Sequence, residues 1–419
     1  PKMAASHSTL QDWRLDISHL NHPYLPPAIR VCVPARYCVG SPLGAGAFGV
    51  VCSGTHLVSG GEVAIKQIRD PFEHPKQAKC FLREIVYQSR LDHPNVLRIK
   101  DLWLGLDGAL YVCTDRMETD LGWVIKSPQP LTRDHVVYFI YQITLALKYL
   151  HAANIVHRDL KPGNCLVSGN CDLKICDFGM CRVIDQEPEQ PEPLSEYVVT
   201  RWYRAPEIIL CTQYDQSVDL WSLGCIMAQL IQRKPLFKGD SSRAQISAIT
   251  DVTGVPANFL ETVQMPDGAR RFLQRTHNEH PTPPEVHWED HIEVAQSYGA
   301  HLDPSASAAL SATLQLDPSK RVSASHFLGL PFLAQLHDAE SELVPDKPLC
   351  SKWEKHVDYS DPSGPRTVVE MEMERLNPKT PETVRRRVVT LNEIEDALYT
   401  KGDLLPEPAG DALDPMELA

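Results

Sequence analysis

The feature that most constrains this chain is a polar stretch near its middle. Residues 157–164 read His-Arg-Asp-Leu-Lys-Pro-Gly-Asn, and Asp177-Phe178-Gly179 follows thirteen residues after Asn164. A single Asp or Asn is usually a helix cap or a turn residue. Here two carboxylates, an amide and a lysine come from one short segment. Transfer of a phosphoryl group needs metal ions across the phosphates, a carboxylate near the attacking hydroxyl and cations for the developing charge. The segment therefore predicts a site that handles metal-bound phosphates.

Composition limits the class of protein to which that segment belongs. The 419 residues are 43% hydrophobic and 23% charged, which is ordinary for globular domains and predicts two or three of them. The net charge of −13 argues against a general nucleic-acid binder, because such proteins need surplus Lys and Arg. No apolar run reaches the roughly 18–20 residues of a membrane span. The twelve cysteines contain no CxxC pair, which favours reduced thiols over a zinc site or a disulfide scaffold.

Periodicity divides the chain into segments of different character. Strand-like alternation over about 37–115, as at Glu62–Ile68, is interrupted by one amphipathic helix at 76–91. A helical period begins after residue 117, with Thr132 as an N-cap. The acidic, Pro-rich residues 185–194 predict a loop. We expect four parts: an irregular N-terminal extension (1–36), a small β-rich unit (37–116), a larger helical unit (117–333) and a partly packed C-terminal extension (334–419).

A glycine-rich stretch lies within the β-rich segment. Residues 44–50 read Gly-Ala-Gly-Ala-Phe-Gly-Val, and residues 63–66 read Val-Ala-Ile-Lys one strand further on. Glycines let a hairpin lie flat over phosphates, because no side chain blocks the approach of the backbone. A dinucleotide-binding βαβ unit would need a helix opening at the glycines, which this pattern does not have. Lys66 is then a candidate phosphate contact, with Glu84 on the following helix as its partner, although many strand lysines are simply solvated.

With Ala205-Pro206-Glu207, these stretches form the ordered signature set of a eukaryotic protein kinase, and the chain resembles that family. Residues 195–208 (Ser-Glu-Tyr-Val-Val-Thr-Arg-Trp-Tyr-Arg-Ala-Pro-Glu-Ile) resemble more narrowly a mitogen-activated protein kinase (MAP kinase) of the extracellular-signal-regulated type. Residues 117–121, 175–179 and 218–225 fit the same resemblance, which covers about 37–333. It implies an α+β, bilobal kinase fold with an antiparallel β-rich N-lobe, a mainly helical C-lobe and ATP in the cleft.

The resemblance also implies roles for individual residues. Asp159 would receive the proton of the substrate hydroxyl and Lys161 would steady the transferred group, while Asn164 and Asp177 would hold Mg²⁺. Lys66, paired with Glu84, would contact the α- and β-phosphates of ATP. The full set of residues expected to bind ATP is Leu43, Gly44, Ala45, Gly46, Ala47, Phe48, Gly49, Val51, Ala64, Lys66, Glu84, Thr114, Asp115 and Met117.

Regulation and recognition follow from the same resemblance. Ser195 and Tyr197 would be phosphorylated to activate the kinase, although the family usually has Thr at the first of these positions. Each phosphate can order a loop by gathering arginines: Arg83, Arg158 and Arg182 around the first, and Arg201 and Arg204 around the second. Val199 and Arg204 match positions that favour Pro directly after the phosphorylated residue. Asp338 and Glu342, in an acidic stretch, are candidates for docking basic peptides, although a solvated acidic turn is as good an interpretation.

The resulting prediction is a Ser/Thr kinase for Ser/Thr-Pro sites, dependent on ATP and Mg²⁺. Its expected partners are protein substrates, an upstream dual-specificity kinase and phosphatases, without nucleic acid or membrane. We expect a monomer in the cytoplasm and also in the nucleus. A cyclin-dependent-like Pro-directed kinase is the alternative within the enzyme class. A non-catalytic kinase-fold scaffold is the alternative from another class, and the intact set of metal and phosphate ligands argues against it.

Overall fold

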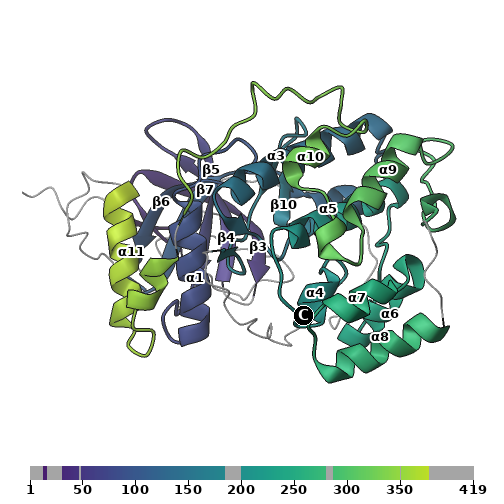
Figure 1. Ribbon diagram of the computed structural model, residues 1–419. Helices are drawn as coiled ribbons and strands as arrows, with labels where there is room; N and C mark the ends of the chain where they lie inside the picture. Colours follow the sequence, from purple (N-terminus) through teal and green to yellow (C-terminus); the bar gives the residue numbers. More distant parts are fainter. Residues whose placement is uncertain are drawn as a thin grey trace, which may run out of the picture. The chain divides into compact units, whose positions relative to one another are not determined.

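The computed structural model describes residues 13–16, 31–46, 49–184, 200–279, 286–349 and 351–376 (Figure 1). The chain forms two compact units. Unit 1 takes its described residues from Pro1–Ala78, Ile99–Arg116 and Tyr359–Ala419, and unit 2 takes its own from Lys79–Arg98 and Met117–Asp358. Each unit is considered by itself.

Unit 1 is built on a five-stranded antiparallel sheet with the strand order β3-β4-β5-β7-β6. The strands are β3 (Tyr37–Gly46), β4 (Gly49–His56), β5 (Glu62–Ile68), β6 (Ile99–Leu104) and β7 (Leu110–Asp115). The alternation predicted for residues 62–68 is confirmed, because Val63 and Ile65 are buried while Ala64 and Lys66 are half-buried on the other face. The sheet thus has one face against the core and one face left for other contacts.

The core of unit 1 extends beyond the sheet to a strand that the sequence did not predict. β2 (Val31–Pro34) pairs antiparallel with β1 (Trp13–Asp16), and all four residues of β2 are buried. The indole N–H of Trp103 donates to the carbonyl of Cys32 at 2.8 Å, and the N–H of Cys32 donates to the Tyr111 hydroxyl at 2.9 Å. The prediction of an irregular segment over 1–36 is therefore wrong at these two strands. The signal was missed because a strand buried along its whole length lacks polar–apolar alternation.

The C-terminal extension also contributes to the core of unit 1. Helix α11 (Ser363–Leu376) packs along β6, as Figure 1 shows. Val369 is buried, and Met373 packs against the core cluster that contains Trp103 and Tyr111. This part of the extension is integral to unit 1.

Unit 2 is mainly helical and is organised around two long helices. α3 (Arg133–Ala152) begins at the predicted N-cap, where the Thr132 hydroxyl accepts from the N–H of His135. α5 (Ser217–Gln232) packs against α3 and is buried along nearly its whole length, as its apolar sequence requires. Its other helices are α2 (Leu121–Lys126), α4 (Pro206–Ile209), α6 (Ser242–Thr253), α7 (Ala257–Thr262), α8 (Asp267–Glu279), α9 (Pro304–Thr313) and α10 (Ala324–Leu328).

Short strands and single turns fill the space between these helices. A three-stranded sheet has the order β11-β10-β8, and a second pair joins β12 to β9. These strands are β8 (Thr119–Asp120), β9 (Ile155–Val156), β10 (Cys165–Val167), β11 (Leu173–Ile175) and β12 (Arg182–Val183). The 3-10 turns are η1 (Pro162–Asn164), η2 (Trp288–Asp290), η3 (Pro318–Lys320) and η4 (Lys352–His356).

Helix α1 (Pro75–Gln88) corresponds to the helix predicted at 76–91. Its residues from Lys79 onward belong to unit 2, where they meet the C-terminal turn η4 through an edge-to-face contact between Tyr87 and Trp353. Among the described helices, none is both long enough and apolar enough to cross a lipid bilayer.

Candidate active site

A hairpin in unit 2 brings the two predicted metal ligands to the same end of a small sheet. β10 and β11 are antiparallel with Cys165 opposite Ile175, so Asn164 directly precedes the hairpin and Asp177 follows it. The N–H of Cys176 donates to the carbonyl of Asn164 at 2.9 Å and closes this end. Thirteen residues of sequence separation are thus reduced to neighbouring positions. A carboxylate and an amide oxygen are hard donors that suit Mg²⁺.

Asp159 is held by the residues expected to act with it. Its carboxylate accepts from the Lys161 ammonium at 2.7 Å and from the Asn164 amide nitrogen at 3.2 Å, and its carbonyl accepts from the same nitrogen at 2.8 Å. Because the nitrogen of Asn164 is committed to Asp159, its oxygen is the atom left for a cation. Asp159, Lys161 and Asn164 therefore lie in contact with one another, with Asp159 only 8% exposed.

The backbone before Asp159 is fixed by a buried carboxylate. Asp219 on α5 is completely buried and accepts from the N–H groups of His157 and Arg158, each at 2.9 Å, and from the His151 ring at 3.0 Å. Burial alone would raise the pKa of Asp219, but the hydrogen bond and charge of His151 and the backbone donor hold that pKa below its ordinary value. Asp219 is thus an ionised anchor for the loop.

Two non-glycine residues of this region adopt a left-handed backbone. Arg158 has φ 69° and Asp177 has φ 64°. Such conformations cost energy and persist only where the surroundings enforce them, as the bonds to Asp219 do for Arg158. His157 supports the arrangement structurally, since its ring packs edge-to-face on Phe178 and bonds the Cys176 carbonyl at 3.0 Å.

The glycine-rich stretch in unit 1 forms the predicted hairpin between β3 and β4. Gly44 lies opposite Val51 and Gly46 opposite Gly49, whereas Ala47 and Phe48 fall outside the described residues. Gly49 has φ +152°, and a Cβ atom built there would lie 1.9 Å from the carbonyl oxygen of Gln67. No larger residue fits at that position without moving β5.

Four residues expected to bind ATP share one face of the unit 1 sheet. Lys66 lies opposite Val51 on β4, and Ala64 lies opposite Thr114 on β7. Directly opposed residues point to the same face, so all four stand on the side away from the buried Val63 and Ile65. Leu43 is exposed on β3. Asp115 at the end of β7 pairs with Lys100 at 2.5 Å.

Glu84 and Met117 belong to unit 2, and Glu84 is buried on α1. The predicted pairing of Lys66 with Glu84 joins the two units and stays a prediction.

Three predicted phosphate-binding arginines gather in unit 2. Arg158 is 6% exposed, and its guanidinium stacks over the Tyr214 ring at 4.9 Å. Burial and the positive charges of Arg182 and Arg83 lower the pKa of Arg158 to about 10. Its buried Nε has no hydrogen-bond partner within the described part of the chain. We call Arg83, Arg158 and Arg182 the arginine cluster. Its like charges and open donor fit an anion, while Ser195 and Tyr197 lie outside the described residues.

The second predicted pair, Arg201 and Arg204, follows the predicted phosphorylation sites in the sequence. Burial and neighbouring Arg201 lower the pKa of Arg204, against the opposing charge of Asp159. The Nε of Arg204 is buried and without a partner among the residues described. Arg201 donates to the carbonyl of Asp240 at 3.5 Å. Arg204 is therefore close enough to Asp159 for the two side chains to interact electrostatically.

The two predicted docking acids, Asp338 and Glu342, differ in their exposure to solvent. Asp338 is exposed. The side chain of Glu342 is only 2% exposed, because its carboxylate accepts from Lys148 at 2.7 Å and bonds His337 at 2.6 Å. The negative charge of Glu342 is thus neutralised inside unit 2, and of the two predicted docking acids Asp338 is the exposed one.

Sequence reasoning missed one partner of the site. The carboxylate of Glu354, in the C-terminal turn η4, binds Arg83 of the arginine cluster. These residues lie 271 positions apart, and neither motif nor periodicity connects them. The only sequence feature that pointed to this segment was the number of charged residues in the proline-containing C-terminal extension, and that feature does not identify a partner for Arg83.

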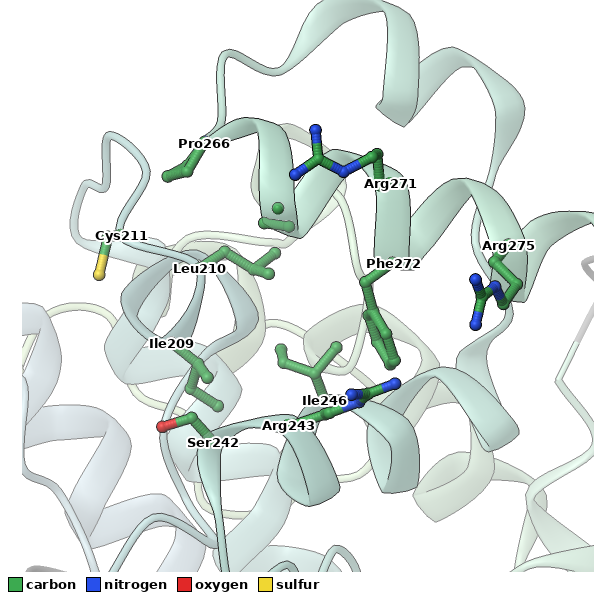
Figure 2. Close-up of a pocket in the computed structure, with 12 residues that line it drawn as sticks. Ile209, Leu210, Cys211, Ser242, Arg243, Ile246, Pro266, Arg271, Phe272 and Arg275 are labelled. Carbon is green, nitrogen blue, oxygen red and sulfur yellow. The ribbon is translucent and has the colours of Figure 1, made fainter.

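A separate hollow of about 570 Å³ lies between α4, α6 and α8 of unit 2. Figure 2 shows the apolar side chains of Leu210, Ile246 and Phe272 around it. Arg243, Arg271 and Arg275 border it as well, and all three are exposed. None of the predicted site residues lines this hollow, so it is distinct from the catalytic loop.

Comparison with known proteins now decides the family. Residues 37–333 match the family described as "Protein kinase domain". A mitogen-activated protein kinase homolog, NTF6 of Nicotiana tabacum, is 40% identical over 315 residues, which cover 74% of this chain and 80% of that protein. This chain belongs to the MAP kinase family. Mitogen-activated protein kinase 4a of Physcomitrium patens is 39% identical over 77% of this chain and 82% of its own length. Mitogen-activated protein kinase 4 of Arabidopsis thaliana is 39% identical over 74% of this chain and 79% of its own length.

Family membership explains the geometry of both units. This MAP kinase has the antiparallel β-rich and the helical parts of the bilobal kinase fold, and it is a Ser/Thr protein kinase. It uses ATP and a divalent metal ion, acts on proteins and receives signals from upstream kinases, as its family does. The cyclin-dependent-like alternative and the scaffold alternative are not retained.

Proposed function

We propose that this MAP kinase transfers the γ-phosphate of ATP to Ser or Thr followed by Pro, with Mg²⁺ as its metal. The observation that carries the proposal is the convergence of Lys161 and Asn164 on Asp159 beside Asp177. When bound, Mg²⁺ would offset the negative charge of the phosphates. Asn164 Oδ1 and the Asp177 carboxylate are the protein atoms that would hold it.

The chain's own residues perform the remaining tasks. The carboxylate of Asp159 orients the substrate hydroxyl and accepts its proton, which requires an ionised group within hydrogen-bond reach. Lys161 lies 2.7 Å from that carboxylate and supplies positive charge for the group in transfer. Asp219 holds the N–H groups of residues 157 and 158, so the catalytic loop is positioned before substrate arrives.

An isosteric substitution tests this assignment. Asp159→Asn keeps the shape of the side chain and removes its basicity, and we expect kcat to fall by about 10²–10⁴-fold. The KM for ATP should change little, because Asp159 does not bind the nucleotide. Equal rates for wild type and variant on a Ser-Pro peptide would contradict the role of Asp159.

Activation by phosphorylation of Ser195 and Tyr197 is the second part of the proposal. The arginine cluster supports it, because three guanidinium groups with an unpaired buried donor suit a phosphate of charge about −1.5 to −2. We propose a dual-specificity upstream kinase and phosphatases as regulators. Peptide mapping of residues 183–201 after treatment with such a kinase, combined with activity of Ser195→Ala and Tyr197→Phe, tests the two positions. Full activation of the double variant would contradict the proposal.

Proline selectivity is proposed from the residues after the phosphorylation sites. Val199 and Arg204 match positions that favour Pro in MAP kinases and related enzymes, and proline leaves no N–H unpaired in a pocket that offers no acceptor. A peptide pair that differs only as Ser-Pro and Ser-Ala measures this preference. Equal kcat/KM values for the two peptides would refute it.

Cellular context completes the proposal. We propose a monomer that works in the cytoplasm and in the nucleus, with Asp338 contributing to the docking of basic peptides. Sedimentation of the full chain, localisation of a tagged protein and the affinity of a basic peptide for Asp338→Asn test these points in turn.

A further inference from the structure

A Ser-Pro dipeptide lies in unit 1, directly before the glycine-rich stretch. Ser41 and Pro42 belong to β3, which stands at one end of the strand order β3-β4-β5-β7-β6. Ser41 is exposed, and so is Leu43 two residues further on. The outer side of an edge strand offers its backbone groups to another chain. The dipeptide is therefore accessible to an enzyme that selects Ser before Pro.

The pairing of β3 with β4 is interrupted at this dipeptide. Residues 40 and 41 of β3 face the single residue Ser53 of β4, and the register shifts again between Pro42 and Gly44. Such a β-bulge leaves a residue outside the ladder and redirects its side chain. An edge segment with few ladder bonds opens locally at low cost. The bulge thus eases the extended pose that a protein substrate must adopt in a kinase.

The bulge also places the hydroxyl of Ser41 beside that of Ser53. The two hydroxyl oxygens are 3.4 Å apart, and Ser53 donates to the carbonyl of Ser41 at 2.9 Å. Ser53 lies opposite Ala64 on β5, and Ala64 lies opposite Thr114 on β7, so these residues share one face of the sheet. Lys66 is the diagonal neighbour of Ser53, and such neighbours lie about 7–8 Å apart. The Ser41 hydroxyl therefore adjoins the face expected to bind ATP.

A second Ser-Pro dipeptide within the described residues, Ser127-Pro128, is placed differently. The Ser127 hydroxyl donates to the carbonyl of Val124 at 2.9 Å, and its own carbonyl accepts from Arg233. Ser127 is also the C-cap of α2 and is only half-buried. Phosphorylation of Ser127 would require the end of this helix to unfold and these contacts to break. Ser41 is the more accessible of the two serines.

We propose that Ser41 is phosphorylated by a second copy of this kinase, and that the phosphate lowers the affinity of the kinase for ATP. The inference rests on the Ser/Thr-Pro specificity proposed above. In the transfer, Ser41 Oγ bonds to the γ-phosphorus of ATP while the bond from that phosphorus to the β,γ-bridging oxygen breaks. ADP leaves, and the hydroxyl proton passes to the Asp159 carboxylate of the copy that acts as enzyme.

Charge explains why this phosphate would inhibit. A phosphoserine carries about −1.5 to −2 charges at neutral pH. On Ser41 it would stand beside Ser53, on the face where Lys66 is expected to contact the α- and β-phosphates of ATP. The added charge repels the nucleotide and competes with it for the Lys66 ammonium. An active kinase would in this way limit its own use of ATP.

Transfer between copies is measured with two forms of the full-length kinase. Wild type is the enzyme, and Asp159→Asn with an affinity tag is the recipient. The tryptic peptide of residues 37–66 contains Ser41, and its fragmentation locates the phosphate. We expect phosphorylation at Ser41 to be at least about tenfold faster than at Ser127. Pro42→Ala in the recipient should slow phosphorylation of Ser41 by at least about tenfold, because the enzyme loses the proline it selects.

ATP binding tests the effect of charge at this position without any transfer. Ser41→Glu adds a negative charge, and Ser41→Gln is the uncharged variant of similar shape. We expect the Kd for ATP, measured by titration calorimetry, to be at least about fivefold higher for Ser41→Glu than for Ser41→Gln. Val58→Glu adds the same charge in the β4–β5 turn, where Val58 is 84% exposed, and should bind ATP as wild type does. The phosphorylated recipient provides the same measurement if Ser41→Glu does not fold.

A Ser-Pro peptide assayed in parallel separates this inference from the proposed function. Phosphorylation of the peptide without phosphorylation of Ser41 would overturn the inference and leave the proposed specificity intact. A Ser41 phosphate that leaves the Kd for ATP unchanged would overturn its inhibitory role. Failure to phosphorylate either the peptide or Ser41 would overturn the proposed specificity and, with it, the assignment of a second copy as the enzyme.

Discussion

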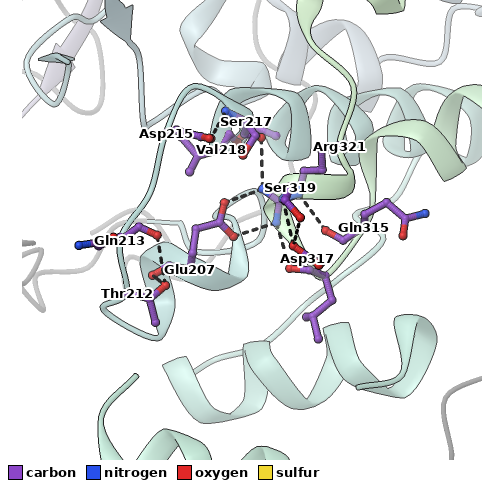
Figure 3. Close-up of polar contacts among 12 residues, drawn as sticks. Glu207, Thr212, Gln213, Asp215, Ser217, Val218, Gln315, Asp317, Ser319 and Arg321 are labelled. Atoms are coloured by element: carbon purple, nitrogen blue, oxygen red, sulfur yellow. Dashed lines mark hydrogen bonds and ion pairs between the residues drawn. The ribbon is translucent and has the colours of Figure 1, made fainter. Parts of the chain in front are cut away.

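Arg321 and Glu207 form an ion pair in the interior of unit 2 with almost no exposure, 0% and 2% for their side chains. The two guanidinium nitrogens donate to the two carboxylate oxygens at 2.5 and 2.8 Å, as Figure 3 shows. Arg321 also donates to the carbonyls of Gln315 and Ser217 and lies over the Trp221 ring at 5.1 Å. The pair thus fastens the start of α4 to the turn at η3.

Removal of one partner should destabilise the kinase strongly. Arg321→Ala leaves the Glu207 carboxylate buried and uncompensated, a change that costs about 3–5 kcal/mol in buried pairs. We expect this loss in the free energy of urea unfolding. Arg366→Ala, which breaks the exposed pair with Glu370, should cost less than about 0.5 kcal/mol. A loss for Arg321→Ala as small as the loss for Arg366→Ala would show that the buried pair is dispensable.

Asp219 should act on turnover rather than on nucleotide binding. Asp219→Asn puts an amide N–H where the carboxylate accepts from two backbone N–H groups and His151, so at least one buried donor loses its acceptor. Because those donors fix the loop before Asp159, we expect kcat to fall at least about tenfold, the equivalent of 1.4 kcal/mol. The KM for ATP should stay within about threefold. A rise in KM with unchanged kcat would place the role of Asp219 elsewhere.

His93 should make the kinase less stable at mildly acidic pH. Its buried ring accepts from the N–H of Asn95 at 3.0 Å and packs against Tyr149. Burial, helped by the charge of Lys174 and opposed by Asp92, lowers the pKa of His93 to about 4 from 6.5. The unfolded chain therefore binds the extra proton first, and stability falls as pH decreases from about 6.5 towards 4.

The measurement is the difference in unfolding free energy between wild type and His93→Gln across that range. Glutamine can accept from Asn95 but does not titrate. Between pH 7 and pH 4.5 we expect wild type to lose on the order of 1–3 kcal/mol more unfolding free energy than His93→Gln loses. Parallel pH curves for the two proteins would show that His93 is not buried in its neutral form.

Thr114 should govern the access of bulky inhibitors to the sheet face that carries Lys66. It lies opposite Ala64 on β5, is small and half-buried, and stands on the same face as the residues expected to bind ATP. Thr114→Met places a longer side chain on that face, and we expect bulky ATP-competitive compounds to lose at least about tenfold in potency through overpacking. Nucleotide competition measures the change, and the KM for ATP is the control. Unchanged potency would contradict this position for Thr114.

The parts of the site that could be predicted from the sequence are those that one segment supplies. Asp159, Lys161 and Asn164 come from one loop, and the hairpin that adds Asp177 is short, so spacing alone brings these groups together. The strand at Glu62–Ile68 and the cap at Thr132 were equally accessible, because local periodicity and capping chemistry determine them.

The parts that could not be predicted depend on long-range packing. β2 carries no alternation, since both of its faces are buried. The partner of Arg83 lies in a segment whose composition suggested only partial packing. Glu342 resembled a solvated acid, yet Lys148 on α3 draws it inside. In each case an opposite charge or an apolar surface distant in the sequence decides the outcome.

The position of α11 has a consequence for where this protein can be shortened. The match to the protein kinase domain ends at residue 333, but Val369 and Met373 complete the apolar cluster beside β6. A protein cut at residue 333 would present that sheet edge to water and invite self-association, although every catalytic group would be retained. We therefore expect the smallest part of the chain that folds as a soluble enzyme to be longer than residues 37–333, which match the protein kinase domain.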